Sequence, residues 1–118
     1  MELDINGKKY ELRYGLSFIN ALDNLYTQDM NGVEFGMGIE MLNAYLDLGR
    51  PTALFNAIKA GTSHLKSKPS NDGIENFLED IAMSDDDKYE KLFDQLKEEI
   101  EQAPFLKRAL QNMKNAEK

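Results

Sequence analysis

Residues 1–26 read MELDINGKKYELRYGLSFINALDNLY, and the spacing of the apolar residues changes within this stretch. Up to Tyr14, apolar and charged residues alternate on both sides of Asn6-Gly7, which predicts two strands joined by a two-residue turn with positive φ. From Leu16 onward the apolar residues recur with the period of a helix, and Ser17 is its expected N-cap. Because an isolated hairpin is only marginally stable in water, we expect helices to cover its apolar face.

The rest of the chain carries further helical patterns. Apolar stripes predict helices over about residues 16–26, 37–48, 51–60, 72–82 and 85–103, followed by a short amphipathic segment after Pro104. Asn71 or Asp72 is the expected cap of the fourth helix. Residues 27–36 are polar and contain glycine, so we expect a loop that returns Val33 and Phe35 to the core.

These patterns predict a mainly α protein with a small N-terminal β-hairpin, an α+β fold in which about five helices pack on the hairpin. The 118 residues fit a single domain over 1–118, with the hairpin at 1–14 and a helical core at 16–82. Residues 84–118 would form an acidic helix and a C-terminal amphipathic tail.

Charge is distributed unevenly along the chain, whose net charge is −7. Residues 72–102 contain 12 acidic and 3 basic residues, whereas residues 103–118 contain 1 acidic and 4 basic residues. An acidic body repels phosphate, so we expect no binding to nucleic acid. The N-terminus has early acidic residues and no long apolar stretch, so we expect neither a secretory signal nor a membrane segment, and a cytoplasmic protein.

No group of residues predicts catalysis, a metal or a cofactor. The chain has no cysteine, and its one histidine, His64, lies in a connector without a nucleophile or metal-binding spacing, so we expect a surface histidine. Asp85-Asp86-Asp87 lacks the alternation and glycine of a calcium loop, and a capping box between Ser84 and Asp87 explains it better.

Two other groups have structural explanations. Gly32, Gly36 and Gly38 match no phosphate-binding loop, so we expect turn glycines. Glu98, Glu99 and Glu101 have the spacing of a solvated helix face rather than of an acid–base pair.

Binding of another protein is therefore the expected activity, through the apolar stripes of the last two helical segments. Such stripes more often pack on their own core than on a partner, and the segment after Pro104 is expected to be the more exposed. The candidate partner-binding residues are Tyr89, Leu92, Phe93, Leu96, Phe105, Leu106, Leu110 and Met113.

An ordered series of short patterns resembles a known family. The patterns include INGKKYELRYG (residues 5–15), NGVEFGMG (31–38), LGRP (48–51) and LFNAIKAGT (54–62). Together, over about residues 1–82, they resemble the tail assembly chaperones of long-tailed (siphovirus-type) phages and prophages of Gram-positive bacteria. The acidic helical remainder is similar in character only.

The resemblance implies a chaperone without turnover that binds the tape measure protein, keeps it soluble and helps recruit tail-tube subunits of the major tail protein. It implies work in the cytoplasm of the bacterial host, absence from the mature virion and self-association into oligomers. A structural head–tail or tail completion protein of the virion is the alternative, and a small enzyme or nucleotide-binding regulator is a third.

Overall fold

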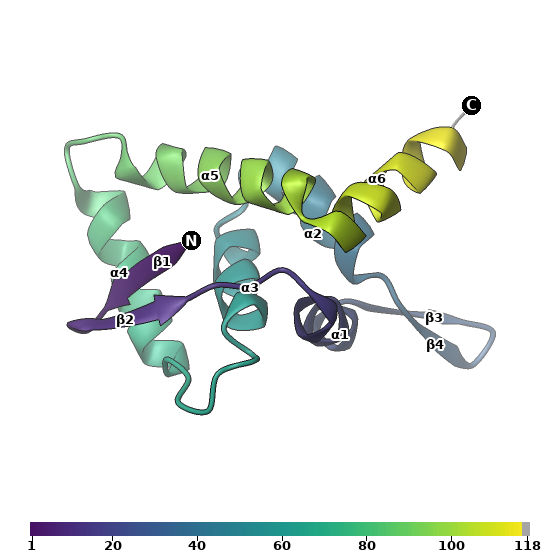
Figure 1. Ribbon diagram of the computed structural model, residues 1–118, viewed down its shortest axis with the longest axis horizontal. Helices are drawn as coiled ribbons and strands as arrows, with labels where there is room; N and C mark the ends of the chain where they lie inside the picture. The colour runs from purple at the N-terminus through teal and green to yellow at the C-terminus, as the bar shows by residue number, and fades with distance from the viewer. Residues whose placement is uncertain (117–118) are drawn as a thin grey trace.

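The computed structural model describes residues 1–116, apart from the side chains of Gln28, Met30, Glu34, Phe35 and Ala116. Within this range the chain forms six helices and two antiparallel hairpins, which confirms the predicted α+β class with one more helix and one more hairpin than expected. The elements are β1 (Glu2–Ile5), β2 (Lys8–Glu11), α1 (Leu16–Leu25), β3 (Thr27–Met30), β4 (Val33–Gly36), α2 (Gly38–Asp47), α3 (Pro51–Gly61), α4 (Asn71–Met83), α5 (Lys88–Gln102) and α6 (Pro104–Ala116). The two hairpins lie at opposite ends of a helical body (Figure 1).

The first hairpin forms as predicted. β1 and β2 pair so that Ile5 lies opposite Lys8, and the turn residues Asn6 and Gly7 have φ values of 56° and 77°. Ile5 and Tyr10 are buried, and the chain leaving β2 is held to the end of α3 by an Arg13 N–H that donates to the Gly61 carbonyl at 2.9 Å. The apolar face of the hairpin therefore contributes to the core. This packing is expected, because a two-stranded hairpin by itself is only marginally stable in water.

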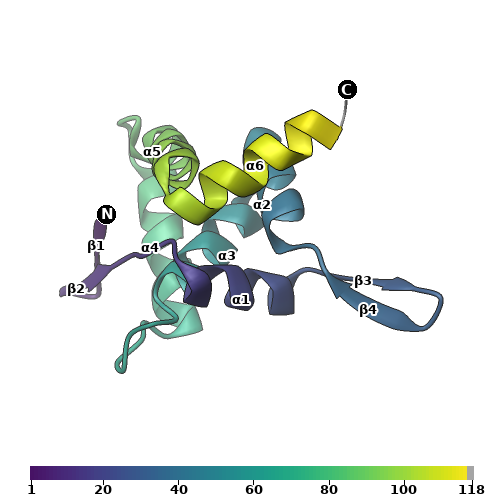
Figure 2. The same ribbon diagram turned by 45° about the vertical axis from the view of Figure 1, so that its right-hand side comes forward.

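The loop predicted over residues 27–36 is wrong, because β3 and β4 form a second hairpin there. Its turn is Asn31-Gly32, with φ values of 57° and 82°, and the Gly32 N–H donates to the Asp29 carboxylate at 2.9 Å. The hairpin extends away from the helices as an arm (Figures 1 and 2). Val33 is 54 % exposed rather than returned to the core, and the Phe35 side chain lies outside the described residues.

At the base of this arm α1 and α2 approach closely through glycine. A Cβ at Gly38 would lie 2.5 Å from Leu22 Cβ, and one at Gly36 would lie 2.6 Å from Asp23 Cβ. Gly36 and Gly38 thus allow close packing and do not form a turn. Of the three glycines predicted to lie in turns, Gly32 alone does so. The Asp23 carboxylate also accepts from the Gly38 N–H at 2.9 Å, so α1 supplies the cap of α2.

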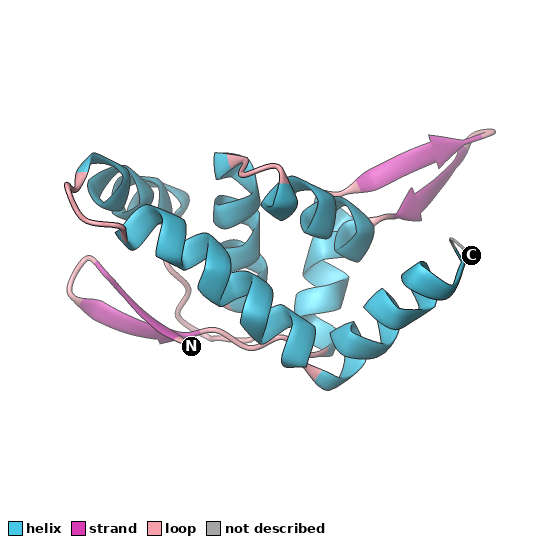
Figure 3. Ribbon diagram, turned by 90° about the horizontal axis from the view of Figure 1, so that it is seen from above, coloured by secondary structure: helices cyan, strands magenta, loops and turns pink. Residues whose placement is uncertain are grey.

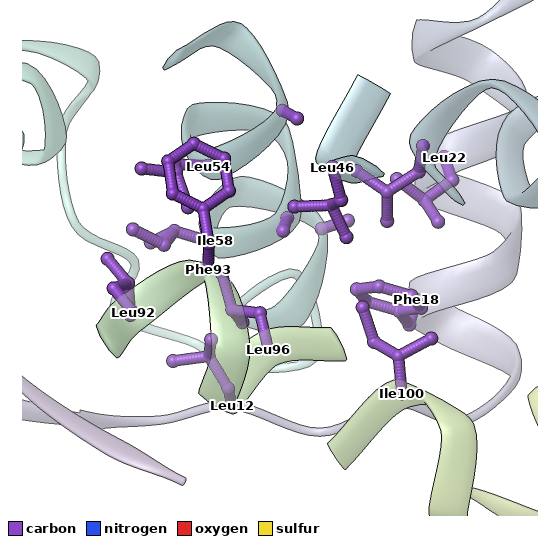
Figure 4. Packing of buried hydrophobic residues seen from close by; sticks show 14 of the residues in the cluster. Leu12, Phe18, Leu22, Leu46, Leu54, Ile58, Leu92, Phe93, Leu96 and Ile100 are labelled. Carbon is purple, nitrogen blue, oxygen red and sulfur yellow. The ribbon is translucent and has the colours of Figure 1, made fainter. Parts of the chain in front are cut away.

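The core forms where α5 lies across the other helices (Figures 1 and 3). Figure 4 shows Leu92, Phe93, Leu96 and Ile100 of α5 among side chains of α1, α2, α3 and the segment that follows β2. The facing side chains are Leu12, Phe18, Leu22, Leu46, Leu54 and Ile58, all of them buried. α5 thus turns its apolar stripe toward the core and most of its charged residues toward solvent.

Three predicted helix caps are wrong. The N-cap of α1 is Gly15 rather than Ser17, and it makes no side-chain cap. α4 begins one residue earlier than expected, because the Ser70 hydroxyl accepts from the Gly73 N–H at 3.0 Å. Before α5, the Ser84 hydroxyl pairs with Asp86 at 2.7 Å, and Asp86 accepts from the Lys88 N–H at 3.3 Å. The predicted capping box is therefore absent: Asp86 accepts from the first helical N–H, and the N-cap Asp87 makes no side-chain cap.

We expect Gly38→Ala to destabilise the protein even though alanine is the better helix former. The added methyl group would meet the Leu22 side chain and backbone, and such overpacking costs about 1–3 kcal/mol. Urea unfolding followed by circular dichroism measures this change. Gly15→Ala is the comparison, because nothing lies within 4 Å of its added Cβ; at this N-cap the change should cost less than about 1 kcal/mol. An unchanged or increased stability of Gly38→Ala would contradict the close contact.

Candidate partner-binding surfaces

The predicted partner-binding residues divide into a buried and an accessible set. Leu92, Phe93, Leu96 and Leu106 are buried in the core. Tyr89, Leu110 and Met113 are half-buried against that core, and Phe105 is 53 % exposed. A partner can reach the second set in this conformation, whereas the first set is covered by the protein itself. As expected, the stripe after Pro104 is the more exposed of the two.

An open apolar groove lies between α3 and α4. Its walls are the first turn of α3 and one face of α4, and α5 contributes one aromatic residue at its first turn. The lining residues are Pro51, Thr52 and Phe55 of α3, Glu75, Leu78, Glu79 and Ala82 of α4, and Tyr89 of α5. We call this surface the α3–α4 groove. Its volume is about 450 Å³, and carbon atoms form most of its surface.

The accessible groups of the α3–α4 groove are apolar or acidic. Phe55, Leu78 and Tyr89 are half-buried, while Glu75 and Glu79 are exposed. The Tyr89 ring packs edge-to-face on the ring of Phe93, with 5.3 Å between the ring centroids, so a core residue holds Tyr89 in place. Burial raises the pKa of Tyr89, and the negative charge of Glu90 raises it further, so the phenol is neutral at physiological pH.

A second groove lies on the other side of α4, between it, β1 and α5. Leu3, Phe77, Ile81 and Leu92 form its apolar part. Its charged lining residues are of both signs, namely Lys88, Lys91, Asp94 and Glu98. This groove therefore has no single preference for the charge of a ligand.

The cleft between α2 and α6 is mainly polar. Asn43, Asp47, Glu101, Lys107 and Lys114 are among its lining residues, with Leu110 as an apolar contact. Opposite charges face each other across it, which suits the internal docking of α6 on the body.

Comparison with known proteins places the chain in a family. The family model described as phage tail assembly chaperone protein, TAC, matches residues 2–114. The chain belongs to this family. No curated protein and no solved structure matches it. The match covers the acidic helix α5 and most of the basic helix α6 as well as the first 82 residues, so the family relationship extends further along this chaperone than the quoted sequence patterns.

The histidine and the acidic residues considered in the sequence analysis do not form a reactive or metal-binding group in the described part of the chain. His64 lies three residues after the end of α3 and is half-buried rather than on the surface, and its buried Nε2 has no hydrogen-bond partner in the part of the chain that the structure describes. Asp86 is exposed, and its hydrogen bond from Ser84 lowers the pKa of its carboxyl group. Over residues 1–116, no three acidic or histidine side chains form a metal-binding group, and no helix has the length and apolarity of a membrane span.

Sequence patterns missed the α3–α4 groove because its members are distributed over three helices. Within α4, however, Glu75, Leu78, Glu79 and Ala82 have the spacing of one helix face, next to the face that buries Ile74. The signal in the sequence that could have indicated this groove is Leu78, an apolar residue between Glu75 and Glu79 on one face of α4.

We expect neighbouring substitutions in α6 to differ sharply. Leu106→Ala removes a side chain with 0 % exposure, which costs about 2–5 kcal/mol, because a cavity remains. Phe105→Ala removes a mainly exposed ring and should change stability by less than about 1 kcal/mol. Chemical denaturation of both variants measures the difference. Equal stabilities would contradict the docking of α6 through Leu106.

Proposed function

We propose that this protein binds the tape measure protein during phage tail assembly, keeps it soluble and helps recruit tail-tube subunits. The observation that carries this proposal is the match of the tail assembly chaperone family over residues 2–114. The open apolar α3–α4 groove supports it, because a chaperone that acts by binding needs accessible apolar surface. Such a chaperone acts by binding alone, without turnover.

The charge distribution suits a solubilising role. A tape measure protein that forms long amphipathic helices would associate through its apolar stripes if these were left bare. A bound protein that covers those stripes also adds its own hydrated outer surface to the complex. Residues 72–102 carry a net charge of −9, and most of these acidic residues are exposed on α4 and α5. Repulsion between the coated complexes would therefore oppose aggregation.

We further propose the setting implied by the sequence resemblance, a long-tailed phage or prophage of a Gram-positive host. The chaperone would act in the host cytoplasm, together with the tape measure and major tail proteins, and would be absent from the mature virion. We also propose that residues 1–118 form a single domain. In support, buried residues from β1 to α6 belong to one cluster, which includes Ile5, Leu54 and Leu106.

Co-expression tests the proposed function directly. We expect the tape measure protein encoded in the same gene cluster to be insoluble alone, and soluble and co-purified when this chain is present. A size-matched acidic protein is the control for non-specific solubilisation. A tape measure protein that stays insoluble with the chain would contradict the proposal.

The composition of purified virions separates a chaperone from a structural protein. We expect quantitative mass spectrometry to detect the tape measure and major tail proteins in virions but not this chain. Stoichiometric amounts of the chain in mature particles would instead support the alternative, a head–tail or tail completion protein.

A further inference from the structure

We propose that the α3–α4 groove is the client-binding site, and that its occupant is an amphipathic α-helix whose apolar stripe is bordered by Lys or Arg. This inference rests on the proposed function, since it takes the client to be a helical segment of the tape measure protein. It goes further by assigning the site, the conformation of the bound segment and the sign of its charge.

The dimensions of the groove fit a short length of helix. Glu75, Leu78, Glu79 and Ala82 occupy positions i, i+3, i+4 and i+7 of α4, so they form one continuous ridge along two helical turns. At 1.5 Å per residue this ridge is about 10 Å long. Pro51 and Phe55 of α3 form the opposite wall. A client helix lying in the groove would present residues with the same i, i+3/i+4, i+7 spacing.

The apolar contacts are already held in position. Phe55 and Leu78 pack partly against the core, and Tyr89 is held by its edge-to-face contact with Phe93. A client therefore gains apolar contact with side chains that lose little conformational freedom on binding.

The charge of the groove determines which helix it accepts. Glu75 and Glu79 are its two charged lining residues, and both are accessible. Lys59 lies over the Phe55 ring at 6.0 Å from its centroid, but it is not among the residues that line the groove. The groove on the other side of α4 has bases as well as acids. Of the two grooves beside α4, the α3–α4 groove is thus the one that combines an apolar floor with a rim of one sign, which favours cationic residues beside the client's apolar stripe.

The basic helix α6 of a second copy is a competing occupant. Lys107 and Arg108 are exposed on it, and Phe105 lies beside them. However, Leu106 is buried in its own protomer, and Leu110 and Met113 pack partly on the same core. Phe105 is thus the one large apolar side chain in the described part of α6 that is mainly exposed, whereas a two-turn groove accepts a full apolar stripe. A helix from the client fits the groove better.

Two exposed positions on α4 allow a matched steric test. Ala82→Arg places a long side chain into the groove, and Asn76→Arg places the same side chain on α4 outside it. Both positions lie in a helix that tolerates arginine, so both variants should fold, which circular dichroism and thermal unfolding check. Overlapping synthetic peptides of the tape measure protein are then tested by fluorescence anisotropy. We expect Ala82→Arg to weaken binding of the tightest peptide at least tenfold and Asn76→Arg to leave it unchanged.

A second pair of variants tests the sign of the charge. Glu79→Lys reverses a groove charge, while Asp80→Lys makes the same change at the next, exposed residue, which does not line the groove. We expect Glu79→Lys alone to weaken binding several-fold and to reduce its salt dependence. The peptides that bind should be those with Lys or Arg beside an apolar stripe. Tight binding of acidic peptides, or equal effects of the two variants, would overturn the assignment of charge.

The outcomes separate this inference from the proposed function. If the wild-type chain fails to solubilise the tape measure protein, the proposed function fails. If wild type and Ala82→Arg solubilise it equally well and bind its peptides equally tightly, only the groove assignment fails. If Ala82→Arg leaves peptide binding intact but abolishes self-association in analytical ultracentrifugation, the occupant is a second copy and the inference is wrong.

Discussion

The burial of one face of α5 holds the other elements of this protein together. Leu92, Phe93, Leu96 and Ile100 fill the space above α1, α2 and α3, and each fully buried side chain of this kind contributes about 1.5–3 kcal/mol. α5 has 15 residues, a length at which an isolated helix is only marginally stable in water, so its stability depends on burying this face. Its position late in the chain means that the body is completed only when α5 closes over it. The first hairpin joins the same cluster through Ile5 and Tyr10, and the residue after it, Leu12, is buried there as well.

Close packing between α1 and α2 determines where the second hairpin points. β3 follows α1 directly and β4 leads into α2, so the two helices hold both ends of the arm. Gly36 and Gly38 allow the approach, and the Asp23 carboxylate satisfies the first free N–H of α2. The arm itself adds little to the core: its strands pair only with each other within the described residues, and Val33 is largely exposed. Its direction is thus a consequence of helix packing at its base.

The candidate binding surfaces of this tail assembly chaperone also arise from helix packing. α4 buries Ile74 and leaves apolar side chains on both flanks, where Leu78 faces one groove and Phe77 and Ile81 face the other. The two grooves have similar apolar character and differ in the charges at their rims. A binding site of this kind needs no reactive group. It depends on how far apart the helices stand and on which charged residues border the gap.

The sequence by itself determined the elements whose signals are local. The alternation around Asn6-Gly7 predicted the first hairpin, and apolar periodicity predicted the helices, because both patterns depend on residues that are neighbours along the chain. The same reasoning failed for residues 27–36. Asn31-Gly32 is an equally local turn signal and Val33 and Phe35 alternate with polar positions, but β3 has a single apolar residue, Met30, and so gives no alternating pattern. It also failed for the cap of α2, which comes from Asp23, 15 residues away. Only the tertiary structure decided which apolar stripes the protein itself covers. The apolar stripe of α5 and Leu106 of α6 are buried, while Leu78, Ala82 and Tyr89 line an open groove. The physical reason is that a helix face has the same pattern of residues whether its own protein or a partner covers it, and the packing of distant helices determines which of the two applies.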